Sequence, residues 1–162
     1  MKTIVLLVSR NFPATHKRKG EPTGFESHII CTLNNDLAHQ VKIHTIRANY
    51  PFWAKRIEQV RTGEAILSIR YWSGKPYNSK QVEICQFDKD DGVGIQGLNL
   101  DDIMITGLLK NNDVALTSIN GGLLLSHIAK NDGLSLEDFK EWFRKYDITQ
   151  TMAIIHFTKF RY

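Results

Sequence analysis

The order of hydrophobic and polar positions along the chain predicts alternating strands and helices. Residues 4–8 form an unbroken apolar run, which is typical of a buried strand. The segment 9–22 that follows contains two prolines and five basic side chains, counting His16. Such a polar, proline-containing stretch is predicted to be a basic loop on the surface.

Two helices are predicted on either side of a short strand. Residues 24–39 place apolar side chains at a helical period, and Thr23 with Glu26 three positions later matches a capping box. Residues 41–47 are rich in strand-forming side chains. Pro51 then opens a second helix, which Gly63 closes.

The rest of the chain is predicted to be mostly β-structure with helices near its end. Alternating or β-branched runs predict strands at 65–72, 80–87, 92–98, 113–119 and 151–160. Residues 100–110 fit a strand or a helix. Helices are expected at 123–130 and after Ser135, with Trp53, Trp142 and Phe143 in the core. Because strands and helices do not alternate regularly, the pattern favours an α+β sheet or barrel.

Length, charge and cysteine content narrow the class of protein. A chain of 162 residues fits one domain, 1–162. Cys31 and Cys85 lie far apart without metal-ligand spacing, so neither a metal nor a cofactor is predicted. The run 4–8 is far shorter than the roughly 20 residues of a membrane span, and no secretory signal follows it. We therefore expect a cytoplasmic monomer that does not enter membranes.

A net charge of +4 and a pI near 9.1 make polyanions the more plausible partners. Six cations form a candidate nucleic-acid surface, interleaved with Phe12, Tyr71, Trp72 and Tyr77 on which bases could stack. The alternative is a solvated loop beside core aromatic side chains. The six cations are Arg10, Lys17, Arg18, Lys19, Lys75 and Lys80.

The segment 42–47, Lys-Ile-His-Thr-Ile-Arg, concentrates four polar side chains in an otherwise apolar strand. A lysine whose pKa is lowered by burial can activate a neighbouring hydroxyl as a nucleophile. The alternative is structural, because Lys42 and Arg47 at strand edges are commonly solvated and Thr45 is a good strand residue. Strict alternation would send Lys42 and Thr45 to opposite faces, so the catalytic interpretation requires a bend near Lys42.

This Lys-x-x-Thr-x-Arg motif follows a helix and precedes a helix ending in glycine and then the run 67–72. In that order, the features resemble the core of the ASCH family, whose members share a PUA-like barrel. The resemblance extends from about residue 37 to the end of the sequence and covers the first 36 residues only loosely. It implies a PUA-like α+β barrel of about six strands with surrounding helices, which recognises RNA or a nucleoside.

Small bacterial members of this family are similar to N4-acetylcytidine amidohydrolases, which use a Lys, a Thr and a Glu. The resemblance implies that Thr45 attacks the amide carbonyl and that Lys42 is its base or electrostatic partner. The carboxylate falls on Asp132, which is shorter than the family's Glu by one methylene, about 1.5 Å. Asp132 would orient groups or handle a proton. The alternative interpretation of Asp132 is a loop carboxylate without a catalytic role, which the dipole of the helix after Ser135 favours.

The resemblance also provides expected substrate contacts. Arg47 would bind the substrate or the oxyanion. The remaining substrate-binding candidates are His44, Arg70 and Trp72. Two functions of different class follow: an amidohydrolase acting on an acylated nucleoside, and an RNA-binding module without catalysis.

Overall fold

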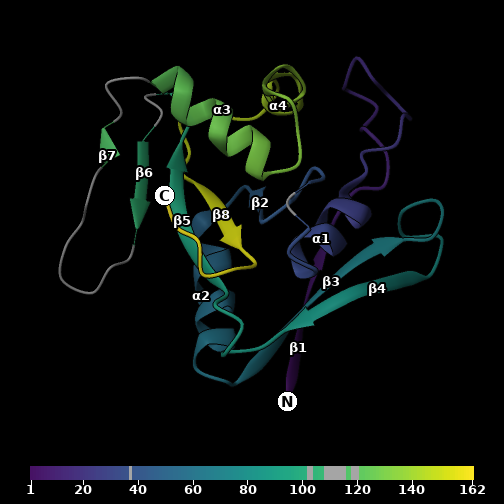
Figure 1. Ribbon diagram of the computed structural model, residues 1–162, viewed down its shortest axis with the longest axis vertical. Helices are drawn as coiled ribbons and strands as arrows, with labels where there is room; N and C mark the ends of the chain where they lie inside the picture. The colour runs from purple at the N-terminus through teal and green to yellow at the C-terminus, as the bar shows by residue number, and fades with distance from the viewer. Residues whose placement is uncertain (37, 102–103, 108–115, 118–120) are drawn as a thin grey trace.

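Two separate β-sheets and four helices make up the described part of the computed structural model, which covers residues 1–36, 38–101, 104–107, 116–117 and 121–162. The three-stranded sheet has the order β1-β3-β4, and the five-stranded sheet has the order β2-β8-β5-β6-β7. Figure 1 shows the two sheets diverging from each other, with α3 and α4 across one end of the molecule.

The three-stranded sheet joins the start of the chain to a long hairpin. β1 (Lys2–Leu7) pairs in parallel with β3 (Ala65–Trp72), and β3 pairs antiparallel with β4 (Gln81–Phe87). The β3–β4 register shifts between Ile69 and Arg70, which marks a bulge that adds twist to the hairpin.

The five-stranded sheet is antiparallel throughout, and its β2 carries Thr45 and Arg47 of the Lys-x-x-Thr-x-Arg motif. β8 (Met152–His156) lies between β2 (His44–Arg47) and β5 (Gly94–Asn99), and all five of its residues are buried. β6 (Met104–Gly107) and β7 (Leu116–Thr117) continue the sheet beyond β5.

Helix α2 (Tyr50–Arg61) connects the two sheets through the hydrophobic core. It contacts β3 of one sheet and β5 and β8 of the other. Its Ile57 and Val60 are fully buried, and each such side chain stabilises the fold by about 1.5–3 kcal/mol through apolar burial. Asn49 accepts from the N–H of Phe52 at the start of the helix, and Gly63, with φ of 80°, ends it as expected.

The remaining helices are α1 (Phe25–Leu33), α3 (Gly121–Asn131) and α4 (Leu136–Phe143). α4 begins at Ser135, whose hydroxyl accepts from the N–H of Asp138 at 3.0 Å, as the sequence predicted. No helix in the described residues is long and apolar enough to cross a bilayer.

The mixed α+β class is confirmed, but the single closed barrel is wrong for the described residues. A barrel requires an unbroken ladder of strand pairs. Among the described strands, β4 pairs only with β3 and β2 pairs only with β8, so the ladder is interrupted between the two sheets. The chain leaves β4 through a turn at 88–93, and the next strand, β5, joins β8 instead of β4.

The loop 9–22 is not wholly a surface segment. Phe12 and His16 are buried, and both rings lie against Trp142, with centroids 5.7 and 6.1 Å away. The predicted capping box is not formed, because Gly24 and not Thr23 occupies the N-cap position of α1. The Thr23 hydroxyl donates to the carbonyl of Ser9 at 2.6 Å and accepts from the N–H of Phe25, the first residue of the helix, at 3.3 Å. The basic loop is therefore anchored to the body through a small apolar cluster.

Several element boundaries differ from prediction because local geometry ends the elements early. α1 stops at Leu33 instead of 39, just before Asn35 adopts a positive φ of 52°. β8 ends at His156 instead of 160. The ambiguous stretch 100–110 contains strand β6, and most of the strand predicted at 113–119 lies outside the described residues.

Candidate functional site

Lys42 lies outside the regular strand, as the catalytic interpretation requires. β2 begins only at His44. The backbone N–H of Lys42 donates to the carbonyl of His28 at 3.2 Å, and the N–H of Ile43 donates to the carbonyl of Asn131 at 2.9 Å. These bonds to two helices hold Lys42 away from the sheet ladder, so strand alternation does not separate it from Thr45.

The ammonium group of Lys42 is buried against Asp132. Its Nζ lies 2.5 Å from Asp132 Oδ1 and 2.6 Å from the carbonyl oxygen of the same residue. Lys42 is 1% exposed and Asp132 4%, and the ammonium also lies 4.1 Å from the centroid of the Phe25 ring. This is a buried ion pair, so removal of either side chain would leave the charge of the other buried and uncompensated.

Asp132 directly follows the last residue of α3, where a helix dipole disfavours a carboxylate. Its N–H donates to the carbonyl of Ile128 at 2.9 Å. The contact with Lys42 offsets the unfavourable dipole of α3 at this position.

The charges of this pair depend on burial and on each other. Burial lowers the pKa of Lys42, and the neighbouring Asp132 carboxylate partly offsets that shift. Burial alone would raise the pKa of Asp132, but Lys42 and His44 outweigh it and hold that pKa below its ordinary value. The favoured state is an ammonium facing a carboxylate.

Thr45 and Arg47 share one face of β2 and line a small cavity with Lys42 and Asp132. The cavity volume is about 10 Å³, which is room for one water-sized group. Among the described residues, the Thr45 hydroxyl makes no hydrogen bond to protein. Arg47 Nη2 donates to the carbonyl of Leu7, which fixes the guanidinium beside the cavity. Phe25, Trp142 and Phe143 form its apolar wall.

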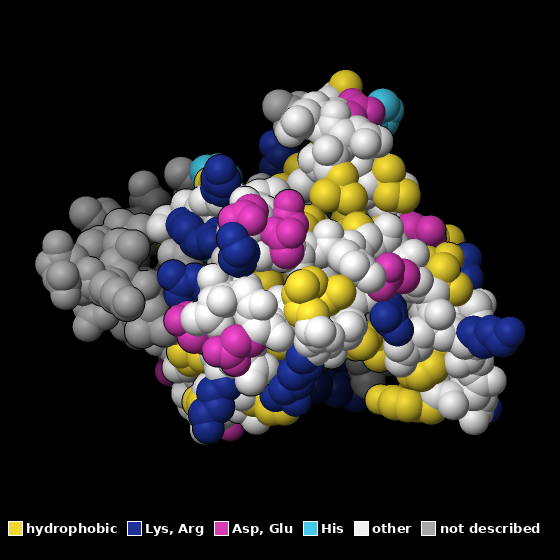
Figure 2. All heavy atoms as spheres, turned by 90° about the horizontal axis from the view of Figure 1, so that it is seen from below, with side chains coloured by type: hydrophobic (Ala, Val, Ile, Leu, Met, Phe, Trp, Pro, Cys, Tyr) yellow, Lys and Arg dark blue, Asp and Glu magenta, His cyan; other side chains and the backbone are white. Residues whose placement is uncertain are grey.

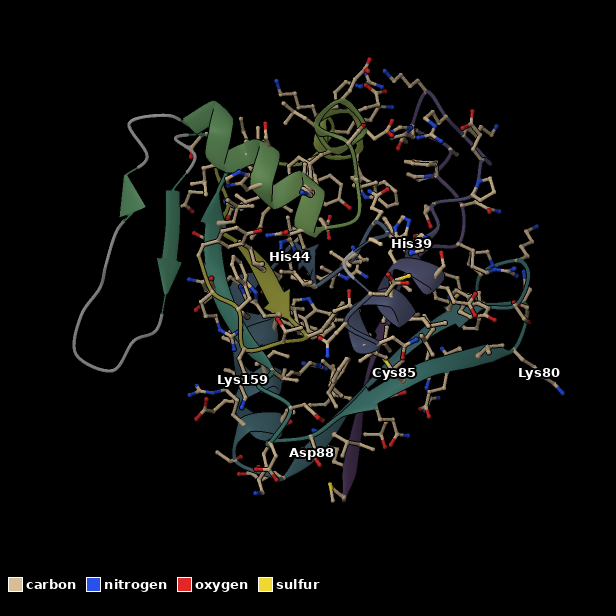
Figure 3. All side chains as sticks on the ribbon, viewed as in Figure 1. His39, His44, Lys80, Cys85, Asp88 and Lys159 are labelled. Carbon is tan, nitrogen blue, oxygen red and sulfur yellow. The ribbon has the colours of Figure 1, made fainter. Side chains whose placement is uncertain are left out.

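His44 was expected to bind substrate, but the structure places it elsewhere. The ring is fully buried, does not line the cavity, and its Nε2 lies 2.8 Å from the hydroxyl of Tyr162. Figure 3 shows His44 in the interior, near α3 and β8. The neighbours Tyr162 and Asn131 were missed by sequence reasoning, since neither belongs to a motif.

Arg70 and Trp72 are not part of this cavity, because they lie on β3 of the other sheet. Arg70 Nε donates to Ser68 Oγ at 2.7 Å, and its guanidinium pairs with Glu83 at 3.3 Å. The ring of Trp72 packs against Tyr77, with centroids 5.4 Å apart. The structure does not bring either residue to Lys42.

The six cations of the predicted nucleic-acid surface fall into two groups. Lys17 pairs with Glu137, and Arg18 pairs with Glu21 and Asp138 at 2.7 and 2.6 Å. Arg10 lies over the Tyr71 ring at 5.0 Å. Within the described ranges, the other three cations are exposed and have no ion pair: Lys19, Lys75 and Lys80.

A continuous basic face is not evident on the side of the molecule seen in Figure 2, where Lys and Arg side chains lie among Asp and Glu side chains. Lys80, on the β3–β4 hairpin, projects away from the body and far from His44 in Figure 3. The free cations and the cavity are therefore separate features.

One group of metal-ligating side chains occurs in the described part of the chain, although the sequence predicted none. Ligand atoms of Cys31, Asp36 and His39 lie within 4.8 Å of one another at the end of α1. A thiol, a carboxylate and an imidazole are zinc donors, but this set supplies only three. Their spacing in the sequence is not that of a known zinc motif, so no metal site was predicted there.

Comparison with known proteins adds no assignment: no protein-family model, no curated protein and no solved structure matches this chain.

Proposed function

We propose that this protein is an amidohydrolase that removes an acyl group from the exocyclic nitrogen of a modified nucleoside of the N4-acetylcytidine type, as the ASCH resemblance implies. One observation carries the proposal: Lys42 and Thr45 of the segment 42–47 line one cavity together with Asp132, which is 90 residues beyond Lys42. An amine, an alcohol and a carboxylate are the groups that nucleophilic attack on an amide needs.

The proton path follows from the ion pair. Lys42 accepts a proton only after one of its own passes to Asp132 Oδ1, which is 2.5 Å away. The Lys42 amine then takes the Thr45 hydroxyl proton as the Thr45 oxygen bonds to the amide carbon. The tetrahedral oxyanion collapses by breaking the C–N bond, and the nucleoside nitrogen leaves with a proton returned through Lys42. Water then hydrolyses the Thr45 ester and restores the ion pair.

The space around Thr45 limits what part of the substrate enters. A cavity of about 10 Å³ admits the carbonyl oxygen but not a nucleobase. A groove of about 310 Å³ is lined by Phe25 together with Arg10 and the first turn of α1. Phe25 lines both spaces, so the base and sugar would lie in the groove while the acyl group reaches past Phe25.

The test is release of cytidine from N4-acetylcytidine by the pure protein, comparing Thr45→Val with Thr45→Ser. Valine keeps the shape and removes the nucleophile, so turnover should fall by at least about 100-fold. Serine keeps a hydroxyl and should retain measurable turnover. No turnover by the wild-type protein, or undiminished turnover by Thr45→Val, would remove the proposal.

A second candidate function, RNA binding without catalysis, is favoured by the tip of the β3–β4 hairpin. Tyr77 is 86% exposed beside Trp72, and the ammonium groups of Lys75 and Lys80 have no ion pair within the described ranges. Exposed rings beside free cations suit stacking of single-stranded bases with contacts to phosphates.

Its test is the salt dependence of binding to single-stranded RNA by the double variant Lys75→Gln/Lys80→Gln. Each lost phosphate contact should shallow the log–log salt slope by about 0.7. The matched control is Lys17→Gln, because Lys17 already pairs with Glu137 and should contribute less. An unchanged slope in the double variant would contradict the hairpin as the contact surface.

A further inference from the structure

The hydroxyl of Tyr162 joins two elements that hold the Lys42–Asp132 pair. Its Oη lies 2.8 Å from His44 Nε2 on β2 and accepts from Asn131 Nδ2 on α3 at 2.9 Å. His44 is two residues from Lys42, and Asn131 is adjacent to Asp132. The hydroxyl therefore contacts the immediate neighbours of both charged residues.

Tyr162 is itself held in place by β5. Its backbone N–H donates to Gln96 Oε1 at 3.0 Å, and Gln96 Nε2 donates to its carbonyl at 3.3 Å. The preceding Arg161 donates to the carbonyl of Gly92 at 2.8 Å. These bonds attach the segment after β8 to the five-stranded sheet, so the hydroxyl is presented in a defined position.

The hydrogen-bond pattern determines which ring nitrogen of His44 carries the proton. Burial raises the pKa of Tyr162, so its hydroxyl keeps its hydrogen. That oxygen accepts from Asn131, and within the described residues the O–H has no acceptor other than His44 Nε2, so the O–H is directed to Nε2, which accepts. Burial lowers the pKa of His44, which keeps the ring neutral. A neutral ring that accepts at Nε2 carries its hydrogen on Nδ1.

His44 Nδ1 faces the carboxylate of Asp132. The distance from Nδ1 to Asp132 Oδ1 is 3.7 Å, and Nδ1 has no hydrogen-bond partner among the described residues. An N–H at this position attracts the carboxylate, whereas the other tautomer would direct a lone pair at it. The electrostatics therefore favour the same tautomer as the bond to Tyr162.

We propose that Tyr162 and Asn131 hold His44 as the Nδ1–H tautomer, and that His44 in this form is a positioning residue that orients the Asp132 carboxylate toward Lys42. The role in turnover rests on the proposed amidohydrolase function; the tautomer does not. In the proton path above, Asp132 receives a proton from Lys42 and returns it, and the directed N–H of His44 keeps Oδ1 in reach of Nζ throughout.

¹⁵N NMR of the histidine rings tests the proposed Nδ1–H tautomer of His44 without any substrate. In the wild-type protein His44 should show a protonated Nδ1 and an unprotonated Nε2. Tyr162→Phe removes only the hydroxyl and should give a mixture of the two tautomers. A protonated Nε2 in the wild-type protein would overturn the proposal, whether or not the protein hydrolyses any substrate.

Two variants of His44 test its role in positioning the Asp132 carboxylate. An asparagine amide can donate from the position of Nδ1, whereas a glutamine amide reaches the position of Nε2. His44→Asn should therefore retain more of the wild-type kcat than His44→Gln, with KM little changed. The loss in His44→Gln should lie between about 10- and 10⁴-fold, the range for groups that orient a catalytic side chain.

Equal loss in both variants, with folding intact by circular dichroism, would show that the Nδ1–H has no positioning role. If the wild-type protein has no turnover, the same variants are compared by the ¹³C shift of the Asp132 carboxyl carbon. His44→Gln should change that shift more than His44→Asn, and the reverse order would overturn the proposal. An inactive wild-type protein with the expected tautomer and shifts refutes the proposed reaction alone.

Discussion

Lys42 Nζ and Asp132 Oδ1 lie 2.5 Å apart although the two residues are 90 positions apart in the sequence. The segment before β2 and the end of α3 must both be in place for this contact to exist. The pair is thus part of both the fold and the proposed reaction. Its contribution to the free energy of unfolding can be measured without knowing the substrate.

Removal of one partner of this pair should destabilise the protein strongly. In Lys42→Met the Asp132 carboxylate stays buried without its ammonium, and the expected loss of unfolding free energy is about 3–5 kcal/mol. Urea denaturation measures it. The double variant Lys42→Met/Asp132→Leu should lose less than Lys42→Met alone, because no buried charge remains. The control Arg61→Gln breaks an exposed pair with Glu58 and should be indistinguishable from the wild-type protein.

Acid should destabilise the protein from about pH 6.5 downward. His156 lies opposite His44 in the β2–β8 pairing, and neither of its ring nitrogens has a partner among the described residues. Burial lowers the pKa of His156 from 6.5 to about 2. Between these values the unfolded chain binds a proton that the folded protein does not, so stability falls as pH falls, by about 1.4 kcal/mol per pH unit for one such group.

Urea denaturation at a series of pH values checks this slope. His156→Phe should reduce the slope below pH 6.5 by about the share of one group, since one titrating ring is removed while the buried His44, whose pKa is also lowered, still contributes. His127→Gln removes an exposed imidazole and should leave it unchanged. At lower pH, protonation of Asp132 adds a further loss, because its depressed pKa contributes stability only above the unfolded value near 3.8.

Gly92, which precedes β5, should tolerate a side chain less well than Gly20, another glycine with a left-handed backbone. Gly92 has φ of 84°, and a Cβ there would lie 3.0 Å from the backbone nitrogen of Lys159. Gly20 has φ of 81° with nothing within 4 Å. Both Gly→Ala variants should lose about 1–2 kcal/mol from backbone strain. Gly92→Ala should lose more, and equal losses by thermal denaturation would contradict the close approach of β5 and the segment after β8.

The loop 9–22 should behave as part of the core. Phe12 is 4% exposed against Trp142, so Phe12→Ala should destabilise the protein by about 3–5 kcal/mol. Tyr77→Ala removes an aromatic ring of similar size from an exposed position and should change stability by less than about 0.5 kcal/mol. Equal effects in chemical denaturation would mean that the loop is not packed.

Local features of the sequence predicted most helices and strands because their causes are local. The Asn49–Pro51 entry and Gly63 bound α2, Ser135 starts α4, and the runs at 65–72 and 80–87 became β3 and β4 with little change. Errors arose where a tertiary contact changes the role of a local signal: the Thr23 hydroxyl donates to the carbonyl of Ser9, and Gly24 rather than Thr23 occupies the N-cap of α1.

The proposed site was predicted only in part. The motif identified Lys42, Thr45 and Arg47, and the resemblance pointed to Asp132; the structure places these four around one cavity. Arg70 and Trp72 were assigned to the same site but lie on the other sheet. Strand spacing carries no information about which sheet a strand joins, so this separation was not visible in the sequence.

The sequence by itself determined the α+β class, the main helices and strands, and the concentration of polar groups at 42–47, because propensity, capping and periodicity act over a few residues. Only the tertiary structure decided that the strands form two sheets, that Lys42 and Asp132 meet, and that Tyr162 reaches His44. These contacts join residues far apart in the chain, and burial, which gives them their strength, exists only after the whole fold has formed.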